Sequence, residues 1–233
     1  MKSLSNFFIY TSSLSTLLPL VLWFSFKSNR KSYSLRIIAL LLVISFSSDL
    51  ASYITIVSGG KSNSIIFNIF WLLHFIILSS FYYTILKNKR GFIRVASFFY
   101  LLFVACFSAN KGFHDFLDEI VPVQSIVFIV YCFQCYSYII KELMPEKIFR
   151  LPLFWINTAV FSYFTLNLYL FGLEKYAFAY LPPDYSMALW IIHNINSILE
   201  NILFAFGMYY TGKRATKLID RSSPDFIHKL KLS

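Results

Sequence analysis

The sequence predicts an all-α membrane protein, a bundle of seven transmembrane helices, and three observations lead to this prediction. Of the 233 residues, 58% are hydrophobic and 14% are charged, whereas a soluble domain is about 45–50% apolar and about 25% charged. The mean hydropathy is +0.63. The apolar residues gather in seven stretches separated by charged residues. This composition excludes a soluble enzyme and a disordered chain.

Each stretch is long enough, or nearly long enough, to cross about 30 Å of hydrocarbon as a helix. Helices are required because lipid offers the backbone no hydrogen-bond partner. The predicted spans are 7–26, 35–57, 65–86, 93–108, 120–140, 152–172 and 187–211, which form one transmembrane domain over 1–212 before a short basic tail over 213–233. We expect the first span to be no cleavable signal, because basic residues follow it and no small-residue cleavage pattern does.

The net charge of +10 is unevenly distributed along the chain. Clusters of Lys and Arg lie in 27–36, 87–94, 141–150 and after 212, which all fall on one side of a seven-span protein. The positive-inside rule therefore predicts an outside N-terminus and a cytoplasmic C-terminus. We interpret the basic excess as a signal of orientation and a contact for lipid headgroups, not for nucleic acid.

The third and seventh spans begin and end alike. Trp71 precedes His74 by three residues, Trp190 precedes His193 by three, and a Tyr-Tyr-Thr sequence ends both spans. A parallel repeat of three spans, one linking span and three spans would explain this. An alternative interpretation is that each Trp simply belongs to the aromatic belt at the membrane surface.

The seventh span carries most of the intramembrane polar side chains. His193, Asn196 and Glu200 follow a spacing of i, i+3 and i+7, so they form one stripe on the helix. Polar groups at membrane depth are costly and usually face the bundle interior. The stripe therefore predicts either a ligand pocket or proton path, or a set of interhelical hydrogen bonds.

Polar residues of other spans fall at comparable depths. Asp49 and His74 lie, with His193, roughly 9–14 Å below the outer surface, and Asn157 lies near the midplane. Asp49 follows two serines, and it is either part of a proton-linked Asp–His switch or a buried carboxyl that is simply protonated or paired. The predicted ligand-binding residues are Asp49, His74, Asn157, His193, Asn196 and Glu200.

Catalysis is the weaker expectation. A zinc hydrolase needs three or four metal ligands, and only two histidines lie within spans. Asp49, His74 and His193 would complete a set only if the bundle brought them together. Cys132 and Cys135, three residues apart, are interpreted as small apolar side chains because no second Cys pair or His cluster accompanies them. We expect no catalytic residue, metal or cofactor.

Three segments carry a resemblance to a known group of proteins. Pro-Leu-Phe-Trp-Ile-Asn-Thr over 152–158, Ser-Asp-Leu over 48–50 and Leu-Trp-Ile-Ile-His-Asn-Ile over 189–195 look similar to segments of uncharacterised bacterial seven-helix membrane proteins. Their genes often neighbour those of two-component sensor kinases. The resemblance implies a multi-pass protein of the bacterial inner membrane with a sensor kinase as partner. One departure is that their third span tends to carry Glu where this chain has His74.

These observations favour a receptor-like or sensory protein with an outward-facing polar pocket for an unknown small ligand. It would pass its signal to a separate cytoplasmic or membrane partner, because the tail is too short to act as an effector. Two alternatives stay open. The repeat hypothesis allows a small-solute carrier, although such carriers use broken helices and interior Gly is nearly absent here. The third alternative is an intramembrane lipid hydrolase.

Overall fold

The computed structural model describes residues 2–60, 62–112, 119–142, 148–180 and 182–221, and every regular element in these ranges is helical. Two short 3₁₀ turns precede α6 and α8. The α-helices are α1 (Lys2–Ser15), α2 (Leu17–Ser25), α3 (Lys27–Lys31), α4 (Tyr33–Val57), α5 (Ser64–Ile85), α6 (Arg90–Lys111), α7 (Ile120–Glu142), α8 (Pro152–Tyr180) and α9 (Pro183–Arg221). The predicted all-α class is confirmed for this part of the chain.

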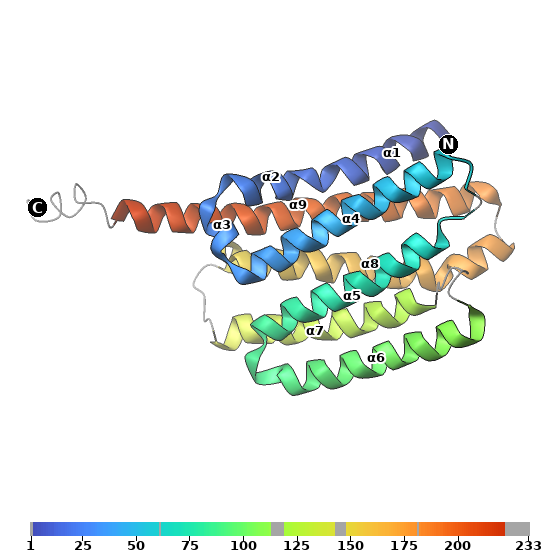
Figure 1. Ribbon diagram of the computed structural model, residues 1–233. Helices are drawn as coiled ribbons and strands as arrows, with labels where there is room; N and C mark the ends of the chain where they lie inside the picture. The colour runs from blue at the N-terminus through green and yellow to red at the C-terminus, as the bar shows by residue number, and fades with distance from the viewer. Residues whose placement is uncertain (1, 61, 113–118, 143–147, 181, 222–233) are drawn as a thin grey trace, which may run out of the picture.

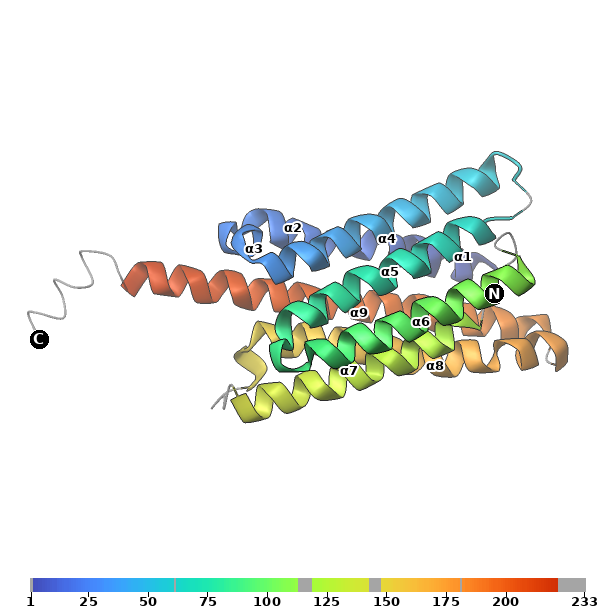
Figure 2. The same cartoon turned by 60° about the horizontal axis from the view of Figure 1, so that its bottom comes forward.

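The long helices lie roughly parallel to one axis and alternate in direction (Figure 1). The chain starts at one end of the bundle, and α9 ends at the other (Figure 1). Seen after a 60° turn, α6 and α7 form one side of the bundle, and α8 and α9 run through it behind α5 and α6 (Figure 2). Each of the seven predicted spans coincides, to within one residue at its ends, with part of one of the helical segments α1–α2 and α4 to α9.

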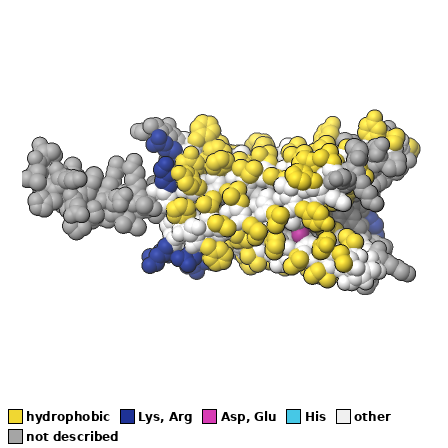
Figure 3. Space-filling view, turned by 90° about the horizontal axis from the view of Figure 1, so that it is seen from above, with side chains coloured by type: hydrophobic (Ala, Val, Ile, Leu, Met, Phe, Trp, Pro, Cys, Tyr) yellow, Lys and Arg dark blue, Asp and Glu magenta, His cyan; other side chains and the backbone are white. Residues whose placement is uncertain are grey.

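Six helical segments of the described chain are long and apolar enough to cross a membrane: Leu4–Ser25, Tyr33–Val57, Ser64–Ile85, Lys87–Lys111, Ile120–Lys141 and Met187–Lys213. The segment that we expected as the sixth span, in α8, is not among them. Asn157, Asn167 and several hydroxyl side chains lower the hydropathy of α8. Large apolar side chains cover much of the face shown in Figure 3. Phe7, Phe98 and Phe133 are among the exposed apolar side chains of the bundle. These properties indicate a membrane protein.

The first predicted span is broken into two helices. Pro19 lacks the N–H that would bond to the carbonyl of Ser15, and α1 ends at Ser15. The chain then turns sharply through α3, and the buried Asn29 side chain holds this turn in place by two hydrogen bonds. The Asn29 Nδ2 donates to the Leu22 carbonyl at 3.0 Å and to the Met208 carbonyl of α9 at 3.1 Å.

Helices α8 and α9 pack closely over much of their length. A Cβ at Gly207 would lie 2.6 Å from Ile156 Cγ1, so the two backbones approach where only glycine fits. On the opposite side, α8 packs against α7 through an aromatic core, in which Phe128 and Phe164 have ring centroids 4.7 Å apart. Helix α8 therefore lies between α7 and α9 and offers polar side chains to both.

Several helices extend beyond the spans predicted for them. The fourth predicted span, 93–108, belongs to the 22-residue helix α6, which is long enough to cross a membrane. Helix α9 continues to Arg221, so the first part of the predicted tail is helical. Residues 222–233 of that tail lie outside the described residues.

Candidate functional site: a polar cluster around Tyr163

Tyr163 of α8 occupies the point where the predicted polar residues meet. Its side chain is 5% exposed. The Tyr163 ring centroid lies 6.1 Å from that of His74 on α5 and 6.2 Å from that of His193 on α9. The two intramembrane histidines, which are 119 residues apart in the sequence (193 minus 74), therefore both contact one aromatic ring.

The polar atoms of Tyr163 join it to α9 and to its own helix. The Tyr163 hydroxyl interacts with Asn167 and Ser197, and it lies within electrostatic range of Glu200 and Asp49. The Asn196 Nδ2 donates to the Tyr163 backbone carbonyl at 3.0 Å. His193 Nδ1 lies 2.9 Å from Asn167 Oδ1, a carbonyl oxygen that can only accept, so Nδ1 carries the proton in this pair.

Helix α1 joins the same region through two serines. Ser13 donates to Asp49 Oδ2 at 2.7 Å, and Asn201 Nδ2 donates to Ser15 Oγ at 2.8 Å. We refer to these residues of α1, α4, α5, α8 and α9 as the Tyr163 cluster: Ser13, Ser15, Asp49, His74, Tyr163, Asn167, His193, Asn196, Ser197, Glu200 and Asn201. Five of the six predicted site residues belong to it.

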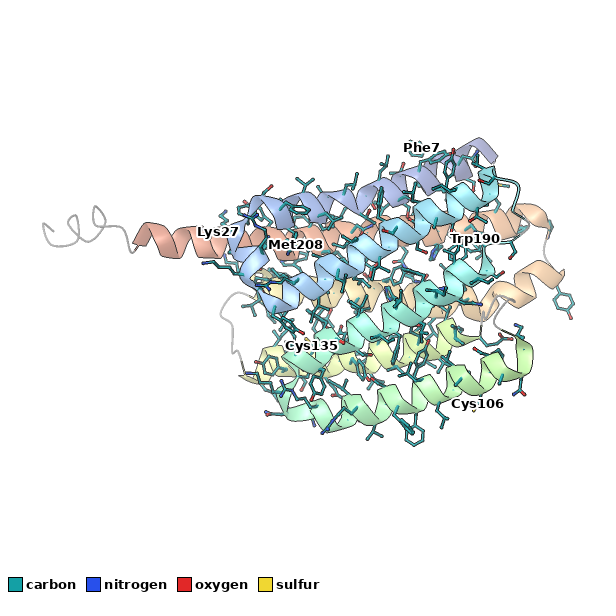
Figure 4. The ribbon with its side chains drawn as sticks, in the orientation of Figure 1. Phe7, Lys27, Cys106, Cys135, Trp190 and Met208 are labelled. Atoms are coloured by element: carbon teal, nitrogen blue, oxygen red, sulfur yellow. The ribbon has the colours of Figure 1, made fainter. Side chains whose placement is uncertain are left out.

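The stripe on α9 is directed inward, as the spacing of its residues predicts. Figure 4 labels Trp190 near one end of the bundle and Met208 near the other, and residues 193–201 lie between them. Asn196 and Glu200 are 1% and 8% exposed. Ile195 and Leu199, their neighbours in sequence, have 45% and 41% of their surface exposed. The polar and apolar faces of α9 are therefore clearly separated.

Several buried polar atoms of the Tyr163 cluster have no hydrogen-bond partner in the described chain. Two of them are acceptors one helical turn apart on α9, Asn196 Oδ1 and Glu200 Oε1. The hydroxyls of Ser48 and Ser52, beside Asp49, are also unpartnered. An unpaired buried polar group costs about 1–3 kcal/mol, and more when it is charged. The cluster can therefore gain free energy from a group that bonds to these atoms.

A chain of hydrogen bonds extends from His74 toward α6 and α7. The Gln124 Nε2 lies 3.2 Å from His74 Nδ1, and Tyr100 donates from its hydroxyl to Gln124 Oε1 at 2.8 Å. An amide nitrogen can only donate, so His74 Nδ1 accepts and the ring carries its proton on Nε2 when neutral. This chain fixes the orientation of the His74 ring beside Tyr163.

Asn157, the sixth predicted site residue, belongs to a separate network. Tyr82 donates to Asn157 Oδ1 at 3.0 Å, and Asn157 Nδ2 donates to the Cys132 carbonyl at 3.2 Å. The Tyr82 oxygen and the Cys132 sulfur are 3.0 Å apart. Both polar ends of the Asn157 amide are thus paired, and this network joins α5, α7 and α8 as a packing contact.

The geometry does not assemble the metal-ligand set considered for a hydrolase. Within the described ranges, no group of three or more His, Cys, Asp or Glu is placed to hold a metal ion. His74 and His193 are committed to Gln124 and Asn167, and Asp49 accepts from Ser13. Cys132 and Cys135 are buried and free of disulfides.

Sequence reasoning missed the residue at the centre of the cluster. A tyrosine within a span is usually taken as an apolar side chain, so Tyr163 carried no signal of its own. Its position four residues before Asn167 places both on one face of α8, and this spacing could have indicated the site. Gln124 was missed because it lies close to the end of its span.

Comparison with protein-family models, with curated proteins and with solved structures gives no match for this chain.

The Asn157 network predicts a stability effect that is separate from the Tyr163 cluster. Replacing Tyr82→Phe removes the donor to Asn157 Oδ1 and leaves a buried acceptor unpaired. We expect a loss of about 1–2 kcal/mol in the free energy of unfolding, measured by denaturant titration in detergent micelles. Tyr10→Phe, at a ring that is 53% exposed, is the matched control and should change stability little. Equal stability of both variants would contradict the assignment.

Proposed function

We propose that this chain is a receptor-like, sensory membrane protein in which the Tyr163 cluster binds a small ligand. The observation that carries the proposal is the Tyr163 cluster, whose residues come from α1, α4, α5, α8 and α9, together with the unpartnered Glu200 Oε1 and Asn196 Oδ1. A purely structural network would be expected to pair its buried atoms, as the Asn157 network does. The unpaired acceptors support a role in recognition.

The free atoms also indicate the chemistry of the ligand. Glu200 supplies a carboxyl oxygen and Asn196 an amide oxygen, one turn apart, and Asp49 adds a second carboxyl group to the cluster. Acceptors and carboxyl groups suit a ligand that donates hydrogen bonds or carries positive charge. We therefore propose a small ammonium or guanidinium compound, or a proton, as the ligand class.

Helix α1 offers a route from the cluster to the opposite end of the bundle. Ser13 and Ser15 bond to Asp49 and Asn201, and the helix breaks directly after Ser15. The break at Thr16 allows α1 to shift without carrying the whole span with it. Beyond the break, α2 leads to Asn29, which is bonded to α9. A change at Asp49 or Asn201 would reach the basic end through this segment.

The proposed orientation and partner follow from charge and from resemblance. Seven crossings, with α8 as the sixth, would put the N-terminus outside and the basic end in the cytoplasm. The ligand would then enter from outside, and a sensor kinase or another signalling protein would receive the output. The bacterial inner membrane is the proposed location. The structure's apolar surface requires a bilayer as its surroundings.

A small-solute carrier is the second candidate. The Trp–His pairs support it, since Trp71–His74 and Trp190–His193 both have ring centroids 5.7 Å apart. The pairs differ in surroundings, because Trp71 is 3% and Trp190 is 38% exposed. Helices α4 to α9 are continuous, whereas carriers bind substrate at broken helices. We therefore favour the sensor.

The number of crossings can be tested with reporters fused to each terminus. Seven crossings put the termini on opposite sides, so a reporter that is active only outside the cytoplasm should work at the N-terminus and fail at the C-terminus. A reporter that fluoresces only in the cytoplasm should give the reverse. Activity of one reporter at both termini would contradict the proposal, because α8 would then not cross.

Ligand binding can be tested by thermal shift of the purified protein with a panel of ammonium and guanidinium compounds. A compound at about 100 times its dissociation constant should stabilise the protein by about 2.7 kcal/mol. Glu200→Gln should abolish the shift and keep the fold, because no described hydrogen bond depends on Glu200 Oε1. An unchanged shift in Glu200→Gln would contradict the proposal.

The control is Gln134→Glu, the reverse exchange at another side chain with a buried, unpartnered Oε1, on α7 and outside the cluster. It should keep the ligand-induced shift. A panel with no effect on the parent protein at any pH between about 5 and 8 would also count against the proposal.

A further inference from the structure

A second candidate site lies at the basic end of the bundle, away from the Tyr163 cluster. An open cavity of about 240 Å³ lies where the start of α4, the end of α5, the start of α8 and the end of the apolar part of α9 meet. Its walls are largely apolar, with Leu35, Ile85, Leu153 and Ile156 among them, and the hydroxyls of Ser34 and Thr211 also line it. A cavity lined by both apolar side chains and hydroxyl groups suits an amphipathic ligand.

The charged residues closest to the cavity lining along the chain are all basic. The cavity-rim cations are the six basic residues that each lie within two positions of a lining residue along the chain: Arg30, Lys31, Arg36, Lys87, Arg150 and Lys213. No Asp or Glu of the sequence lies as close along the chain to a lining residue. Lys and Arg side chains appear as a group at this end of the surface in Figure 3. An anion is the complementary ligand.

Backbone groups add to this charge. Ser32 precedes α4 and makes no side-chain capping bond, so the first N–H groups of α4 have no capping side chain. Helix α8 begins at the same cavity, which is lined by Pro152 and Leu153 of its first turn and by the preceding Leu151. The positive ends of two helix dipoles thus lie at this cavity.

We propose that this cavity binds the headgroup of an anionic phospholipid, with its phosphate at the cavity-rim cations and its first methylene groups against the apolar walls. The cavity lies at the boundary between the apolar spans and the basic residues, which is the depth of lipid headgroups. Its volume is below the roughly 300–1,000 Å³ of drug-sized ligand sites, so it suits part of a lipid and not a whole molecule.

Native mass spectrometry of the detergent-solubilised full chain can test this proposal with phosphatidylglycerol and phosphatidylcholine as probes. We expect one phosphatidylglycerol molecule to stay bound and phosphatidylcholine to be lost. The triple variant Lys31→Gln, Arg36→Gln, Arg150→Gln should bind phosphatidylglycerol about tenfold or more weakly, since basic side chains near an acidic membrane surface contribute about 1 kcal/mol each.

The matched control removes the same charge from the same end. In the triple variant Lys27→Gln, Lys89→Gln, Arg94→Gln, every position is exposed and more than two residues from the cavity lining. This control should retain the bound lipid. Equal loss in both triple variants would overturn the proposal, because it would reduce the effect to net charge alone.

A second variant tests the cavity without a change in charge. Ser34→Leu would fill part of the space and should also weaken phosphatidylglycerol binding, while an unchanged melting temperature without lipid shows that the bundle is intact. Stabilisation of the parent protein by inorganic phosphate to the same extent as by phosphatidylglycerol would overturn the lipid assignment in favour of a free anion. None of these variants touches the Tyr163 cluster, so this test is independent of the proposed ligand response.

Discussion

The pairing of polar side chains inside an apolar bundle is the constraint on which the rest of the structure depends. In hydrocarbon no water can satisfy an amide, hydroxyl or carboxyl group, so each must find a partner on its own helix or on a neighbouring one. The Asn157 network meets this demand completely and joins α5, α7 and α8. The Tyr163 cluster meets it only in part, with Glu200 Oε1 and Asn196 Oδ1 left over. That difference separates a packing contact from a candidate site.

Much of this arrangement could be predicted from the sequence, because polar groups are costly in lipid and the sequence shows where along each helix they lie. The stripe His193, Asn196 and Glu200 predicted an inward face of α9, and the exposed Ile195 and Leu199 confirm that face. The helical segments were also predictable, since their apolar lengths are set by bilayer thickness. The convergence of His74 and His193 on one ring could not be read from spacing, because it depends on how α5, α8 and α9 pack together.

Asn157 is a residue whose partners could not be predicted from the sequence. Its depth and chemistry resembled those of the other predicted site residues, yet its partners are Tyr82 and the Cys132 backbone and not the cluster. Depth along a helix is readable from the sequence, whereas direction around the bundle axis depends on neighbours that are distant in the chain. The two ends of the molecule have different chemistry: carboxyl and amide groups belong to the Tyr163 cluster, and basic residues lie in the sequence where α4 and α8 begin.

The most direct test of the inward-facing polar stripe is cross-linking between α1 and α9 in native membranes. In a chain with Cys106, Cys132 and Cys135 replaced by alanine, the pair Ser15→Cys and Asn201→Cys joins positions whose native side chains bond at 2.8 Å. A short thiol-specific cross-linker should connect this pair rapidly. The pair Ser15→Cys and Ile202→Cys, one residue along α9 on its exposed face, should react slowly. Rapid linkage through position 202 and none through 201 would contradict the account.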